Sequence, residues 1–65
     1  MYDRLKDAVE EYGEVLIHTD SGEKRELHKH NSEFQEGGII KVDADDEIHW
    51  LNAEKVERFS IHYEF

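Results

Sequence analysis

The sequence predicts an α+β domain in which one N-terminal helix packs on a small antiparallel sheet. Two observations predict this class. Apolar residues recur at helical spacing over residues 2–12, and from residue 14 onward they alternate with polar residues as in strands. Glycines and acidic turns separate the alternating stretches. With 65 residues, the chain is expected to form a single domain over residues 1–65.

The predicted helix carries one apolar stripe, which consists of Tyr2, Leu5, Ala8, Val9 and Tyr12. Gly13 follows the stripe and is expected to end the helix in a left-handed conformation. Glutamates crowd the C-terminal end, where the helix dipole prefers cations. We therefore expect the helix to depend on packing against the sheet.

A hairpin is predicted over residues 14–30. Val15 and Ile17 share one face of its first strand, and Asp20-Ser21-Gly22 is a turn signal. A three-residue loop with Gly22 in the left-handed position places Val15 opposite Leu27. A two-residue loop would put polar residues on the face of Val15 and Ile17 instead, so the hydrophobic pattern favours the longer loop.

A second hairpin follows a polar loop, residues 31–38, which Phe34 is expected to anchor in the core. Its strands are expected at residues 39–43 and 47–51, joined by an acidic turn. The predicted pairs place two residues of each strand on the core face, with Val42 opposite Ile48 and Ile40 opposite Trp50.

The C-terminal segment begins with Asn52, which is expected to cap a single helical turn. Val56 then leads into a last strand with alternating apolar residues. The order helix, hairpin, hairpin, short turn, strand resembles that of small bent barrels of the SH3-like and Sm-like type. This resemblance implies a barrel of four to five strands as the alternative to an open sheet.

Apolar residues are predicted on both faces of the sheet, and one short helix covers only one of them. Either the sheet curls into a barrel, or the reverse face is an interface with a second copy or a partner. The last strand is expected to offer an unpaired edge for association with a second copy or a partner. The residues expected to carry association are Leu16, Ile39, Leu51, Phe59, Ile61, Tyr63 and Phe65.

The formal charge of −9, from 17 acidic and 8 basic residues, disfavours nucleic-acid backbones and anionic membranes as partners. It favours a basic protein instead. Adaptation to a salt-rich cytoplasm also explains such acidity. No apolar run reaches the roughly 20 residues of a spanning helix, so we expect a cytoplasmic chain. The negative electrostatic potential of the protein surface is expected to come mainly from Glu10, Glu11, Glu14, Asp43, Asp45 and Asp46.

Five histidines in a short chain without cysteine raise the alternative of a histidine-based metal site. His28 and His30 are expected on one face of the second strand, and His18 shares that face from the first strand. Glu26 or Glu14 could supply a further ligand to a divalent metal. Solvated polar positions on an amphipathic hairpin are the competing explanation.

Catalysis finds little support, because the chain has no cysteine and no glycine loop shaped to cradle phosphate. The sequence therefore favours a non-enzymatic, homodimeric interaction module that needs no cofactor and presents an acidic surface to a basic partner. The alternatives are a histidine-based metal-binding protein and a nucleic-acid mimic that inhibits a basic protein.

Overall fold

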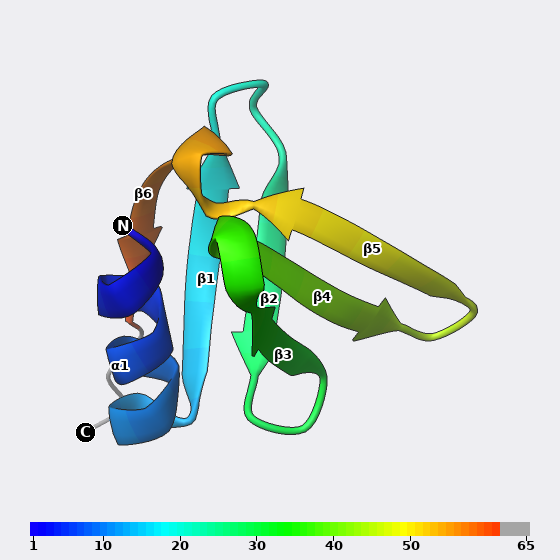
Figure 1. Cartoon of the computed structure of the whole chain (residues 1–65), viewed down its shortest axis with the longest axis horizontal. Helices are drawn as coiled ribbons and strands as arrows, with labels where there is room; N and C mark the ends of the chain where they lie inside the picture. The colour runs from blue at the N-terminus through cyan, green and yellow to red at the C-terminus, as the bar shows by residue number, and fades with distance from the viewer. Residues whose placement is uncertain (62–65) are drawn as a thin grey trace.

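The computed structural model describes residues 1–61, which form one helix and two small antiparallel sheets (Figure 1). The α+β class is confirmed. The strand order is β2-β1-β6 in the first sheet and β3-β4-β5 in the second. In chain order the elements are α1 Tyr2–Tyr12, β1 Glu14–Thr19, β2 Lys24–His28, β3 Ser32–Gln35, η1 Glu36–Gly38, β4 Ile39–Ala44, β5 Glu47–Asn52, η2 Ala53–Lys55 and β6 Val56–Ser60.

Helix α1 has the predicted extent and buries the middle of the predicted stripe, whereas Tyr2 is half-buried and Tyr12 is 45% exposed. Leu5, Ala8 and Val9 are buried beneath it. Gly13 ends the helix with φ 83°, and its N–H donates to the C=O of Val9 at 2.8 Å. This is the left-handed C-terminal stop that the sequence predicts, and glycine adopts it without the steric cost of a Cβ.

The first hairpin has the predicted register. Val15 lies opposite Leu27, and Gly22 has φ 89° in a three-residue loop. Strand β2 is shorter than predicted, however, because it ends at His28 rather than at residue 30. Lys29 still donates its N–H to the C=O of Gly13 at 3.3 Å, but the N–H of Asn31 donates to the C=O of His28 at 3.2 Å and closes a turn, so the chain leaves the sheet before residue 30.

A polar strand, β3, was not predicted, and with it residues 1–61 form six strands, whereas the sequence predicts four to five. Its residues lie in the segment expected to be a loop. Phe34 lies opposite Ile40 on β4 and packs against the core, as predicted for the anchor. Its ring also meets that of Tyr2 edge to face at 5.5 Å between centroids. One half-buried aromatic residue on a short strand is too little alternation to indicate a strand from sequence.

The predicted register of the second hairpin is wrong by one residue. Val42 lies opposite His49, and Ile40 lies opposite Leu51. The loop is the two-residue turn Asp45-Asp46, where Asp45 has φ 27°. A shift of one residue inverts a strand's faces, so Leu51 turns to the core and Trp50 turns outward.

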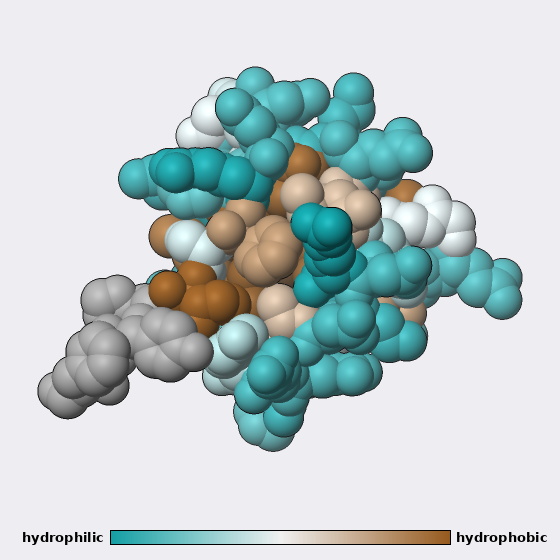
Figure 2. All heavy atoms as spheres, turned by 90° about the vertical axis from the view of Figure 1, so that its left-hand side faces the viewer, coloured by the Kyte–Doolittle hydropathy of each residue, from teal (hydrophilic) through white to brown (hydrophobic). Residues whose placement is uncertain are grey.

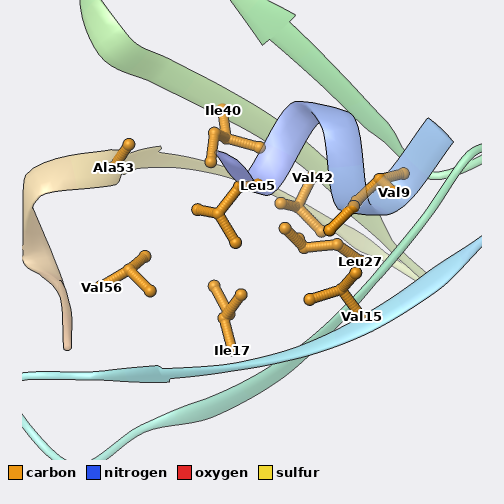
Figure 3. Packing of buried hydrophobic residues seen from close by; sticks show 10 residues of the cluster. Leu5, Val9, Val15, Ile17, Leu27, Ile40, Val42, Ala53 and Val56 are labelled. Atoms are coloured by element: carbon orange, nitrogen blue, oxygen red, sulfur yellow. The ribbon is translucent and has the colours of Figure 1, made fainter. Parts of the chain in front are cut away.

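Both sheets and α1 share one core. Figure 3 shows side chains from α1, both sheets and η2 converging on a common centre, with Leu5, Ile17 and Ile40 among them. Partly buried side chains pack around this centre; these include Tyr2, Phe34, Leu51, Phe59 and Ile61. Hydrophilic residues cover most of the surface on the α1 side, around a smaller apolar area (Figure 2).

The turn before β6 is capped as predicted, because the Asn52 side chain accepts a hydrogen bond from the N–H of Glu54 at 2.9 Å. Strand β6 then pairs with β1, with a register shift between His18 and Thr19. The predicted interface residues Tyr63 and Phe65 lie outside the described residues.

Candidate functional site

The outer face of the first sheet separates its charges into two ends. At one end Glu14 lies opposite His28. At the other end His18 lies between two cations, with Lys24 opposite it on β2 and Arg58 opposite it on β6. The half-buried Leu16 occupies the middle of this face, where the sequence placed it.

A cluster of three possible metal ligands lies at the acidic end. Nδ1 of His28 is 3.9 Å from Oε2 of Glu14, and Nε2 of His28 is 3.4 Å from Oε2 of Glu26. One ligand atom from each residue lies within 4.8 Å of the other two. An imidazole and two carboxylates match the donor types that bind zinc. The side chains are 38–60% exposed, so the cluster is open to water.

Of the metal ligands predicted from sequence, Glu26 and His28 come together, and Glu14 completes the group. His30 lies exposed in the turn after β2. His18 lies among cations at the opposite end of the face. Partial burial of its imidazole lowers the pKa of His18, and the charges of Arg58 and Lys24 lower it further, against an opposing effect of Glu57. The structure therefore divides the predicted ligand set.

The outer face of the second sheet carries a group that we call the Trp50 face, consisting of Ile39, Lys41, Ile48 and Trp50. Trp50 is 60% exposed and Ile48 is 49% exposed, although the sequence placed both in the core. Ile39 is half-buried on this face, as predicted. The two-residue length of the acidic turn sets the register that turns Trp50 outward. Two-residue turns are usually recognised by a glycine, and this turn has none, so its length could not be predicted from the sequence.

One hydrogen bond on β4 shows where the backbone groups of this sheet point. The N–H of Asp43 donates to the C=O of Asn31 at 2.7 Å, so the backbone groups of Asp43 face β3. Alternate residues of a strand direct these groups to opposite sides. The backbone groups of Val42 therefore face β5.

It follows that His49, the partner of Val42, directs its backbone groups to β4. Its neighbours Ile48 and Trp50 direct theirs to the other side of β5. Strand β5 lies at the edge of its sheet, and within residues 1–61 no strand pairs with that side. Two exposed apolar side chains thus coincide with an open row of N–H and C=O groups.

No protein family, curated protein or solved structure matches this chain in the three comparisons made. Within residues 1–61, no helix has the length and apolar character that crossing a membrane requires.

Proposed function

We propose that this chain is a small, non-enzymatic protein–protein interaction module that forms a homodimer. The observation that carries the proposal is Trp50, which is 60% exposed on the open edge strand β5. Tryptophan is enriched among the residues that dominate interface energies, and exposed apolar groups beside an unpaired edge favour association. Leu51, Phe59 and Ile61 pack against the core, so Trp50 and Ile48 take over the role that the sequence assigned to them, and Ile39 keeps the role it was assigned.

The acidic surface of this module is proposed to receive a basic protein. Carboxylates gather at the tip of the β4–β5 hairpin, which Figure 1 shows extending away from α1. The residues are Asp43, Asp45, Asp46 and Glu47, all exposed. A dense negative charge on a projecting element attracts cationic chains and raises their association rate.

We also propose that the two sheets are the two halves of one bent, SH3-like or Sm-like barrel. Only residues 29–31 separate β2 in the first sheet from β3 in the second. The two strands can therefore act as one strand with a sharp bend, which would leave the five strands of such a barrel. The shared core supports the same proposal.

Sedimentation velocity of the purified chain at micromolar concentration tests the homodimer. The proposal expects a dimer that Trp50→Ala shifts toward monomer, while Tyr12→Ala, another exposed aromatic residue, leaves it unchanged. A wild-type chain that stays monomeric up to about 100 µM would contradict the proposal. A dimer with a Kd of that size has a binding free energy of only roughly 5 kcal/mol.

A second candidate function is divalent metal binding by Glu14, Glu26 and His28, which the mutual ligand distances within 4.8 Å favour. Zinc titration by calorimetry tests it. Stoichiometric binding that is lost in His28→Ala and kept in His30→Ala supports this site, because His30 is a nearby exposed histidine outside the cluster. Equal zinc affinity in both variants counts against it.

A further inference from the structure

The four sheet edges in residues 1–61 are not equally open. Strand β2 is protected by the side chain of Asn31. Its Oδ1 accepts from the N–H of His28 at 2.7 Å, and its Nδ2 donates to the C=O of Glu26 at 3.3 Å. These are the two bonds that one residue of an added parallel strand would make, so the side-chain amide occupies part of this edge.

The remaining edges differ in length and regularity. Strand β3 has only four residues. Strand β6 has five, and its pairing with β1 is interrupted by a bulge between His18 and Thr19. Strand β5 has six residues in unbroken register with β4, and contains neither proline nor lysine. Short length, bulges, proline and charged side chains, lysine above all, usually keep an edge from pairing. Strand β5 has none of the first three and no lysine, and its one carboxylate, Glu47, lies at the hairpin end.

We propose that the open edge of β5 pairs with β5 of a second copy, antiparallel and with the symmetry axis beside His49. This inference rests on the proposed homodimer and specifies its contact. Within β5 the outward backbone groups belong to Ile48, Trp50 and Asn52. Among the registers that bond these groups, the one that pairs Ile48 with the second copy's Trp50, and the reverse, brings the exposed apolar side chains together. His49 then faces the second copy's His49, and the two second sheets become one six-stranded sheet.

The side chains in this register are complementary to themselves, as an isologous interface requires. On the outer face, Ile48 meets the second copy's Trp50, an aliphatic–aromatic pair that favours cross-strand association. Glu47 lies opposite Leu51, and Asp46 lies opposite the amide of Asn52. No carboxylate of β5 faces another carboxylate, so the acidic tip does not oppose this pairing directly.

Disulfide trapping tests the register, because the natural chain has no cysteine. In the proposed pairing the two residues at position 49 form a non-hydrogen-bonded pair, with Cα atoms about 4.5 Å apart, within reach of a disulfide. His49→Cys is therefore expected to form a covalent dimer at least tenfold faster than His30→Cys under mild oxidation. His30 is exposed in a turn and reports chance collisions.

A second variant avoids the half-buried position 49, whose imidazole lies 3.0 Å from the carboxylate of Glu47. A spin label at the exposed Asp46→Cys should give a pair distance near 20 Å between Cα atoms, since six residues of strand separate the two labelled positions. Dimers that neither cross-link at 49 nor give this distance overturn the β5 register alone. Monomers in sedimentation under reducing conditions overturn the homodimer as well.

Discussion

Lys41 on β4 lies directly opposite Trp50 on β5, on the outer face of the second sheet. This pair determines which residues of the hairpin face outward. Lys41 and Ile40 are neighbours on β4 and face opposite sides, so the cross-strand partner of Lys41 lies on the face away from the core. The indole is thereby 60% exposed, next to backbone groups of β5 that no strand within residues 1–61 pairs with. The proposed association follows from this one relationship.

Truncation of Trp50 is expected to weaken the dimer without weakening the fold. Trp50→Ala should raise the dimer Kd by roughly 30-fold or more, which corresponds to about 2 kcal/mol for a hot-spot residue. The thermal midpoint of the monomer should change little, because the side chain is 60% exposed. Sedimentation equilibrium and circular dichroism on the same samples check both parts. A large loss of monomer stability would show that the indole belongs to the core.

Two isoleucines provide a matched test of the corrected register. Ile17 is fully buried and Ile48 is 49% exposed, although the sequence predicts both in the core. Ile17→Val should destabilise the fold by about 1 kcal/mol, because it removes a methylene from a packed core. Ile48→Val should cost less than about 0.5 kcal/mol in the monomer. Urea unfolding at low protein concentration measures both, and equal costs would contradict the observed faces.

Asn31 is expected to protect β2 against unwanted pairing. Asn31→Ala removes both hydrogen bonds of the side-chain amide to Glu26 and His28. The loss should destabilise the fold by about 1–2 kcal/mol and promote larger oligomers through the exposed edge. Unfolding and light scattering follow the two effects. An unchanged oligomer size would mean that this edge needs no protection.

His18 should make the fold less stable in mild acid. Its pKa in the folded chain is lowered by partial burial, Arg58 and Lys24, so the unfolded chain binds the proton more readily. The contribution of neutral His18 to folding stability is fully present above the pKa that His18 has in the unfolded chain, near 6.5. It is lost as the pH falls from that value toward the lower pKa of His18 in the folded chain. His18→Gln should flatten stability over this range, measured by unfolding from pH 7.5 to 5. Arg58→Gln should raise the pKa of His18 in an NMR titration.

Salt separates the possible origins of the acidity. Two copies of a chain with a formal charge of −9 repel each other, so the proposed dimer should tighten several-fold between about 50 and 500 mM salt. Binding to a basic protein should weaken over the same range. The monomeric Trp50→Ala variant isolates the effect of salt on the fold, and a strong gain in its stability toward molar salt would favour adaptation to a salt-rich cytoplasm.

The two hairpins show how far sequence patterns determine the fold. In the first hairpin, Gly22 and the burial of Val15 opposite Leu27 point to the same loop length, so the register is predictable. In the second hairpin no glycine marks the turn. Four acidic residues lie close together there, so the sequence does not show which two of them form the turn. The hydrophobic pattern then favoured Trp50 inside, where the observed register places the smaller Leu51.

The candidate sites were predictable to a similar extent. The spacing of Glu26 and His28 on one strand placed them on a common face, and the correct first-hairpin register brought Glu14 beside them. His30 was lost from this group because Asn31 ends the strand early through side-chain bonds that no periodicity reveals. The Trp50 face was not predicted, because the outward orientation of Trp50 depends on the length of the turn between β4 and β5.

The proposed association of two copies through the exposed edge of β5 depends on the exposure of Trp50. Sedimentation velocity of the wild type and Trp50→Ala, from about 1 to 100 µM, tests it most directly. We expect a wild-type dimer across this range and a shift to monomer in the variant. Two monomers, or two equally tight dimers, would contradict it.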